Sequence, residues 1–194
     1  MTAHEFARIS DPCHTLGMPS CQNWLALTVW CHAINELAKE KRPIHIIELG
    51  SYNGSFATQL AIHIWNLKRS DPVFVASTVD TFDRAKGPCE SFAPLSEFVG
   101  LRYHQSDIFA ATQEIVDLIQ QPGISVVLCD GGDKPREMNL FAEYLKPGDV
   151  IASHDWMTPC WPFGEIWLSD VHHTLPRWLP EVFDLGGWLA FRKP

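Results

Sequence analysis

Short apolar runs alternate with segments of helical apolar spacing along this chain, and this alternation constrains the fold more than any other feature. The runs are β-branched and too short for buried helices. They predict strands at 44–49, 73–80, 101–107 and 124–130, with a fifth that follows a proline-glycine turn and ends at Asp155. The segments with helical spacing are 24–42, 55–67, 91–99, 111–121 and 136–145. Strands that alternate with helices indicate an α/β fold, in which helices cover both faces of a mostly parallel sheet.

The C-terminal part departs from this alternation. Residues 164–175 have helical spacing, and two short apolar stretches then flank Gly186-Gly187, which predicts an antiparallel hairpin. The 194 residues show no internal repeat and no break in composition. We therefore expect a single domain over 1–194, with a loop-rich segment at 1–20 and an N-terminal helix region at 21–42.

Charge and composition narrow the class of protein. The net charge is −8 and no basic run occurs, so a surface that binds nucleic-acid phosphates is not expected. No apolar run approaches the ~20 residues that span a bilayer, so no membrane partner is expected either. The six cysteines lack metal-ligand spacing, and three of them fall in predicted helices or strands. These features predict buried thiols in a reducing, cytoplasmic compartment. The sequence leaves a homo-oligomer open.

The stretch ELGSYNG at 48–54 follows the first strand and precedes a helix. It is not a P-loop, because no lysine follows Gly54, and it is not a dinucleotide fingerprint, because Tyr52 stands where that motif needs glycine. The remaining pattern is Glu48-x-Gly50-x-x-x-Gly54. Gly50 permits a sharp turn and Gly54 permits close approach of a ligand to the helix, although a glycine turn required only for packing is the alternative.

An acidic residue occurs at or next to the end of each of the five predicted strands. One such acid is usually a helix cap or turn former. Five along one edge of a parallel sheet instead favour a ligand-binding cleft, because the carboxyl ends of its strands meet there. The acids are Glu48, Asp80, Asp107, Asp130 and Asp155.

Several ordered motifs resemble those of class I S-adenosylmethionine-dependent methyltransferases: IIELGSYNG, VDTFD, YHQSDIF, VVLCDGG and LKPGDVIASHDW. Within that family, the segments from Gly17 to Ala61 and the phrase VDTF are similar to the cephalosporin hydroxylase and macrocin-type O-methyltransferase group. The resemblance spans about residues 17–192. It implies a Rossmann-like, seven-stranded sheet in the order 3-2-1-4-5-7-6.

The resemblance also implies how the cofactor, S-adenosylmethionine, is held. Glu48, Gly50 and Gly54 would surround its methionine part, with the backbone of Ser51 and Tyr52 contributing.

The remaining cofactor contacts implied by the resemblance come from later strands. Asp80 would bind the ribose hydroxyls, with Thr81 and Phe82 beside the adenine. Asp107 would lie near the adenine amine, and Asp130 near the methyl donor.

The reaction is expected at the ends of the fourth and fifth strands. In metal-dependent relatives, residues matching Asp130, His154 and Asp155 bind a divalent cation. Two carboxylates and an imidazole suit Mn²⁺, Zn²⁺ or Fe²⁺ better than Mg²⁺. Without a metal, His154 can act as general base, because imidazole changes charge near neutral pH. The structural alternative makes Asp155 a turn cap and His154 a core residue.

One position departs from the family pattern. Relatives often have a catalytic histidine three residues after the acid of the fourth strand, whereas this chain has Asp133. Either Asp133 or His154 would then accept the proton, or the chain does not perform the transfer.

The sequence thus predicts O-methylation of a small hydroxylated acceptor such as a sugar or natural product. Trp156, Trp161 and Phe163 could stack on its ring, and a loop packed only on itself is the alternative for these residues. An iron-dependent hydroxylase-like relative and a non-catalytic cofactor-binding module are the alternatives.

Overall fold

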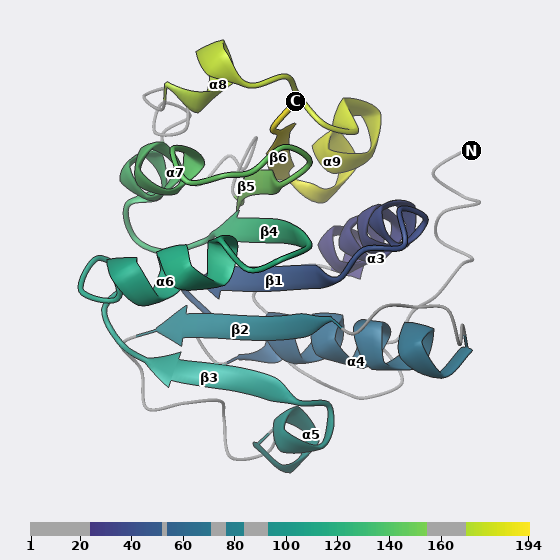
Figure 1. The fold of residues 1–194 in the computed structure, drawn as a ribbon. Helices are drawn as coiled ribbons and strands as arrows, with labels where there is room; N and C mark the ends of the chain where they lie inside the picture. The colour runs from purple at the N-terminus through teal and green to yellow at the C-terminus, as the bar shows by residue number, and fades with distance from the viewer. Residues whose placement is uncertain (1–23, 52–53, 71–76, 84–92, 155–169) are drawn as a thin grey trace.

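The structure is a computed structural model, and it describes residues 24–51, 54–70, 77–83, 93–154 and 170–194. Its centre is a six-stranded sheet in the order β3-β2-β1-β4-β5-β6 (Figure 1). The first five strands are parallel and β6 is antiparallel to β5. The strands are β1 Ile44–Leu49, β2 Thr78–Asp83, β3 Leu101–Gln105, β4 Ile124–Cys129, β5 Val150–His154 and β6 Trp188–Arg192.

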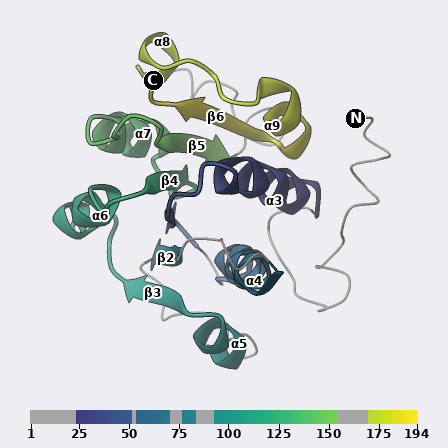
Figure 2. The same ribbon diagram turned by 45° about the vertical axis from the view of Figure 1, so that its right-hand side comes forward.

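Helices cover both faces of the sheet, as Figure 2 shows. One face carries α3, α4 and α9, and the other carries α6, α7 and α8. Helix α5 packs against α4 and β3 at the edge of the sheet. The helices are α3 Trp24–Ala38, α4 Ser55–Ser70, α5 Ala93–Phe98, α6 Thr112–Ile119, α7 Lys134–Ala142, α8 Val171–Thr174 and α9 Pro180–Gly186. No helix among the described residues is both long and apolar enough to cross a membrane. The predicted α/β, Rossmann-like class is confirmed.

The predicted seven-stranded order 3-2-1-4-5-7-6 differs from the structure in detail. The described residues form six strands, and β6 lies beside β5 with no strand between β6 and the edge. The predicted antiparallel strand at the C-terminus is confirmed as β6, but the predicted hairpin is wrong, because the segment before the two glycines is helix α9. Pro180 starts this helix and Gly187 ends it in the left-handed conformation, with φ of 72°. These are start and stop signals of a helix, and β6 pairs with β5 instead.

The second strand also differs from its prediction. It was expected to end at Asp80, but β2 continues to Asp83. Asp80 pairs in register with Arg102 of β3, and the arginine side chain neutralises it inside the sheet. An acid inside a strand was therefore misread as the end of that strand.

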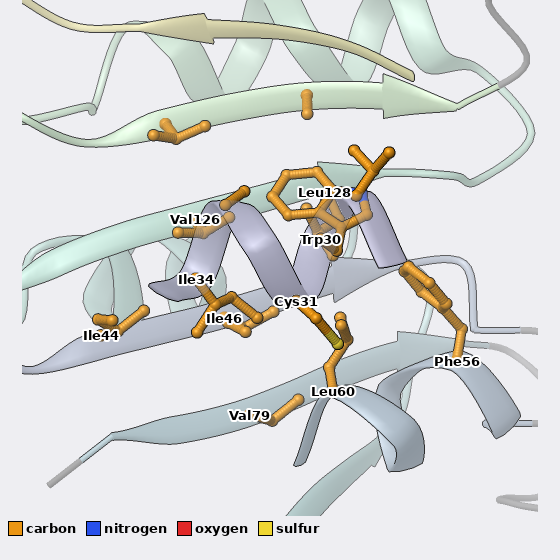
Figure 3. Close-up of a cluster of buried hydrophobic side chains, with 14 of the residues drawn as sticks. Trp30, Cys31, Ile34, Ile44, Ile46, Phe56, Leu60, Val79, Val126 and Leu128 are labelled. Atoms are coloured by element: carbon orange, nitrogen blue, oxygen red, sulfur yellow. The ribbon is translucent and has the colours of Figure 1, made fainter. Parts of the chain in front are cut away.

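Apolar side chains on both faces of the inner strands hold the layers together. On β1, Ile44 and Ile46 face the α3 side, and Ile47 and Leu49 face the α6 side. A fully buried tryptophan, Trp30, lies near the middle of the α3-side cluster in Figure 3. Its ring contacts those of Phe183 and Trp188 at centroid distances of 4.7 and 5.3 Å. This cluster joins α3 to α9 and β6, and so fixes the two ends of the described chain against the sheet.

Gly50, directly after β1, has no room for a side chain. Its φ is +88°, and a Cβ atom there would lie 2.6 Å from the Asp130 carbonyl oxygen and from the Gly131 backbone nitrogen. Its N–H donates to the Phe82 carbonyl at 2.8 Å. The turn after β1 is therefore pressed against the loop after β4, and both lie at the carboxyl edge of the sheet.

We expect Gly50→Ala to lower the free energy of unfolding by about 3 kcal/mol or more, because the added methyl meets backbone on one side and the backbone conformation is strained. Gly100→Ala is the matched control, since Gly100 has φ of +75° but nothing within 4 Å of its Cβ position. It should cost only the backbone strain, about 1 kcal/mol. Denaturant unfolding of both variants measures the difference, and equal losses would contradict the crowding at Gly50.

Candidate active site

A cavity of about 450 Å³ opens at the carboxyl ends of β1 to β4. In open α/β sheets this edge is where ligands bind, and the volume lies within the range of small-molecule sites. The wall comes from four separate turns and from the first part of α7. The lining residues are Gly50, Asp83, Ser106, Asp107, Ile108, Phe109, Asp130, Gly131, Gly132, Asp133 and Glu137.

The turn after β1 contributes Gly50 to the wall. Gly54 has φ of +74°, and its N–H donates to the Ser51 carbonyl at 2.8 Å before α4 begins. The Ser51 side-chain oxygen is buried and has no hydrogen-bond partner among the described residues. Tyr52 lies outside the described residues. An orphaned buried hydroxyl beside a glycine turn is a polar group that a bound ligand can satisfy.

Glu48 lies below this turn, inside β1, and not in the cavity wall. It is 1% exposed, and Thr81 Oγ1 donates to its Oε2 at 2.7 Å. Burial raises the pKa of Glu48 to about 8, although the Thr81 hydrogen bond opposes the shift. Nearby Asp130 and Asp83 raise the pKa further through charge repulsion. Glu48 thus contributes to the floor beneath the turn.

Asp80, expected to bind a ribose, is fully buried inside β2 and does not line the cavity. Arg102 Nη2 donates to its Oδ2 at 2.6 Å, and His104 Nε2 lies 2.9 Å from its Oδ1. The next two residues, Thr81 and Phe82, are buried as well, and Phe82 stacks on the His104 ring at 4.3 Å.

Asp83, which the sequence reasoning missed, takes the place at the end of β2. It lines the cavity, whereas Asp80, three residues earlier, does not. The signal was present in the motif VDTFD, which contains two acids with odd spacing between them. Only the true end of the strand shows which of the two acids reaches the cleft.

Asp107 follows β3 and lines the cavity as expected. Its Oδ1 accepts hydrogen bonds from the backbone N–H groups of Phe109 and Ala110, both at 3.0 Å. This carboxylate therefore also shapes its own turn, as aspartate commonly does. It holds Ile108 and Phe109 in the cavity wall.

Asp130 and His154, two of the three expected reaction-site residues, lie together. His154 Nδ1 is 3.3 Å from Asp130 Oδ1, and Lys134 Nζ is 3.7 Å from the same oxygen. The His154 ring also contacts Trp188 at a centroid distance of 5.0 Å. The third residue, Asp155, lies outside the described residues, as do the aromatic residues of 156–163. Among the described residues, no group of three His, Cys, Asp or Glu side chains could hold a metal ion.

Asp133, the departure from the family pattern, is the N-cap of α7. Its side chain accepts from the Arg136 backbone N–H at 3.3 Å, and the residue also lines the cavity. A carboxylate in a capping position satisfies an orphan helix N–H. The described contacts give Asp133 a structural role at the edge of the site.

Glu137 is a second wall residue that sequence reasoning missed. It is fully buried, and its carboxylate accepts from the backbone N–H groups of Gly131 and Asp133, both at 3.3 Å. Burial raises its pKa to about 7, and those two hydrogen bonds and Lys134 oppose the shift. The weak signal was a glutamate four residues after a capping aspartate at the start of a helix.

Five carboxyl groups thus belong to the wall of one cavity: Asp83, Asp107, Asp130, Asp133 and Glu137. Two cationic side chains of α7 lie beside this wall, and each already has a partner. Lys134 Nζ lies 3.7 Å from Asp130 Oδ1, and the Arg136 guanidinium lies 3.8 Å from the centre of the Phe109 ring. Such a wall favours ligands that carry positive charge or many hydroxyl donors.

Comparisons with known proteins identify the fold. No protein-family model matches the chain, and no curated protein sequence matches it. The solved structure of CalS11, a TDP-rhamnose 3'-O-methyltransferase in calicheamicin biosynthesis, has a TM-score of 0.57 at 15% identity and covers 97% of this chain and 90% of its own. A Staphylococcus aureus protein assigned as a caffeoyl-CoA O-methyltransferase has a TM-score of 0.54 at 10% identity over 99% and 93%.

A third neighbour is a ribosomal protein L11 methylase from Lactobacillus delbrueckii subsp. bulgaricus. Its TM-score is 0.51 at 12% identity, with 89% of this chain and 80% of that one covered. The chain therefore has a fold found in methyltransferases, including O-methyltransferases. The narrower resemblance to the cephalosporin hydroxylase and macrocin-type group is not confirmed by these comparisons.

We expect Glu48→Gln to remove a large part of the pH dependence of stability. A carboxyl group whose pKa is raised from 4.5 to about 8 in the folded state stabilises the fold below pH 4.5, and this contribution is lost as pH rises through 8. Between pH 5 and pH 8 the part of the loss that belongs to Glu48 is about 3 kcal/mol, and the buried Glu137 adds a loss of its own that Glu48→Gln keeps. Denaturant unfolding at the two pH values measures it, and an equally large loss in Glu48→Gln would contradict the assignment.

Proposed function

We propose that this protein is an S-adenosylmethionine-dependent methyltransferase that acts on a hydroxyl group of a small molecule. The observation that carries the proposal is the cavity at the carboxyl edge of the sheet. Its wall combines a glycine turn after β1, an acid at the end of β2 and an acid after β4. The ordered motifs of the sequence and the methyltransferase fold support the same activity.

The residues of the cavity fit the proposed cofactor. Gly50 of the turn after β1 lines the cavity where the methionine part would lie, and the Ser51 hydroxyl of the same turn is buried with no hydrogen-bond partner among the described residues. Asp83 is placed to accept hydrogen bonds from a ribose diol. Asp107 faces the same cavity from the end of β3, where an exocyclic amine can donate to a carboxylate.

Asp130 and His154 are the proposed reaction-site pair. The bound cofactor supplies a methyl group on a positively charged sulfur, and the carboxylates of the wall favour that charge. His154, held beside Asp130, would accept the proton of the acceptor hydroxyl. In the metal-dependent form of the same proposal, Asp130, His154 and Asp155 would bind a divalent cation that lowers the pKa of the acceptor hydroxyl.

A sugar or natural-product hydroxyl remains the proposed acceptor class. The CalS11 neighbour acts on a TDP-linked rhamnose, as its name states. Trp156, Trp161 and Phe163 are the proposed stacking residues. No observation on the described residues favours the iron-dependent hydroxylase or the non-catalytic binding module over this function.

The cofactor assignment is tested by binding of S-adenosylhomocysteine, the demethylated product. We expect Asp83→Ala to weaken its affinity by ~1.5–3 kcal/mol, the range for losing hydrogen bonds to a charged group. Asp117→Ala is the control, because Asp117 is an exposed residue of α6 away from the cavity wall. Isothermal titration calorimetry measures both. If Asp83→Ala binds S-adenosylhomocysteine as tightly as the wild type and a folded Asp80→Ala variant binds it more weakly, Asp80 and not Asp83 binds the ribose.

The role of His154 is tested by turnover with an acceptor that the wild type methylates. We expect His154→Ala to lower turnover at least ~100-fold while its affinity for S-adenosylhomocysteine stays close to wild type, because the imidazole acts on the acceptor. His173→Ala, an exposed position of α8, is the control. Treatment with EDTA separates the two forms of the mechanism, since only the metal form loses activity. Full activity of His154→Ala would remove this residue from the reaction.

A further inference from the structure

Glu137 is the most deeply buried acid in the cavity wall, and none of the roles above uses it. Its side chain belongs to α7, but its carboxylate is directed back at the backbone of the loop that joins β4 to that helix. Because the side chain is 0% exposed and both oxygens accept backbone N–H groups, Glu137 does not present a reactive oxygen to a ligand.

The loop that Glu137 contacts is Asp130 to Asp133, referred to below as the β4 loop. Gly131 N–H donates to one carboxylate oxygen, and Asp133 N–H donates to the other. Asp133 in turn caps the helix that carries Glu137, by accepting from the Arg136 N–H. Loop and helix thus hold each other through reciprocal hydrogen bonds, as in a capping box but with the glutamate one position further along the helix.

Two glycines show how tightly the β4 loop is enclosed. A Cβ atom on Gly131 would overlap Glu137 Oε1 and lie 2.8 Å from Ile108 Cδ1. On the opposite side, the Cβ position of Gly50 is 2.6 Å from the backbone of Asp130 and Gly131. The β4 loop is therefore held between the turn after β1 and the Glu137 carboxylate, and all three line the same cavity.

We propose that Glu137 is a positioning residue that holds the β4 loop against the turn after β1 in the conformation that binds the cofactor. The inference rests on the proposed methyltransferase function. The carboxylate acts through the loop backbone, which places Asp130 and closes one wall of the cavity. A buried acid is costly to the fold, and such groups are concentrated at functional sites.

The proton on Glu137 gives the proposal a readout that a purely structural role lacks. An ionised carboxylate accepts from both loop N–H groups, whereas a protonated one offers an O–H in place of one acceptor. Burial raises the pKa of Glu137 to about 7, the N–H groups of Asp133 and Gly131 and the charge of Lys134 oppose the shift, and Asp130 adds to it. Another titratable group that interacts with Glu137 is the buried Cys129 thiol, whose pKa is raised by its burial and further by Glu137. At pH 8 the carboxylate is mostly ionised and can hold both N–H groups of the β4 loop. The protein should therefore bind the cofactor product more tightly at pH 8 than at pH 6.

The experiment measures affinity for S-adenosylhomocysteine by calorimetry from pH 6 to pH 8. We expect Glu137→Gln to weaken binding about tenfold at pH 8, because an amide has one acceptor oxygen in place of two, and to flatten the pH profile. Glu143→Gln is the matched control: it changes the same residue type at the C-cap of α7, outside the cavity wall, and should bind like the wild type. Glu48 also titrates between pH 6 and pH 8, so its contribution must be separated. If Glu137 controls binding, the affinity of Glu48→Gln should still rise from pH 6 to pH 8.

Gly131→Ala provides a second variant if Glu137→Gln does not fold. Its added methyl group would overlap the Glu137 carboxylate and displace it from the N–H groups of the β4 loop. We expect a similar loss of affinity, and no further loss when the two changes are combined, since both remove one interaction. A folded Glu137→Gln that binds with wild-type affinity and the wild-type pH profile would overturn the positioning role. If the wild type itself does not bind S-adenosylhomocysteine, the proposed function and this inference both fail, whereas a wild type that binds it no more tightly than a folded Glu137→Gln overturns the inference alone.

Discussion

The close contact between the turn after β1 and the loop after β4 is the constraint on which the candidate site depends. Gly50 leaves no space for a methyl group, because the backbone of Asp130 and Gly131 occupies it. The contact is closed by hydrogen bonds on either side, from Gly50 N–H to Phe82 and from Asp130 N–H to Leu49. The strands β2, β1 and β4 thus end side by side, and the residues at their ends line the same cavity. A larger residue at position 50 would separate the walls.

Buried acids are the second feature of this edge of the sheet, and each has a different means of compensation. Arg102 and His104 offset the charge of Asp80. Among the described residues, Glu48 is hydrogen-bonded by the Thr81 hydroxyl alone and Glu137 by two long backbone hydrogen bonds, so burial raises the pKa of both. Proteins rarely keep weakly compensated carboxyl groups in a core. Glu48 lies beneath the cavity and Glu137 lies beside it. The stability lost by burying these two acids is therefore spent at the site where we propose that a charged cofactor binds.

Much of the fold followed from local patterns, and the errors have identifiable physical causes. The runs at 44–49 and 124–129 are short, mostly apolar and bounded by turns, so their strands were predicted correctly. The end of β2 was misplaced because Arg102 compensates Asp80 from a neighbouring strand, and the register of two strands is not visible in either one. The tail was misread because 182–185 is too short to separate strand from helix by periodicity. Pro180 at the start and Gly187 at the end of this segment are the residues that indicate a helix.

The candidate site was predictable to the extent that single residues end strands. That reasoning placed Asp107 and Asp130 at strand ends, and both line the cavity, while their contacts with a cofactor stay predictions. Asp83 and Glu137 were not found, since their positions depend on strand length and on a contact between a helix and a loop. Tyr52, Asp155 and the aromatic residues of 156–163 lie outside the described residues, and their roles stay predictions.

A crystal structure of the protein with S-adenosylhomocysteine bound would show whether the cavity is a cofactor site. We expect the ligand in the cavity at the carboxyl ends of β1 to β4, with its ribose hydroxyls hydrogen-bonded to Asp83 and its methionine part against the Gly50 turn. A ligand bound at another surface would rule out this site. A ligand in this cavity with Asp83 out of hydrogen-bond distance would contradict the assignment of the ribose site.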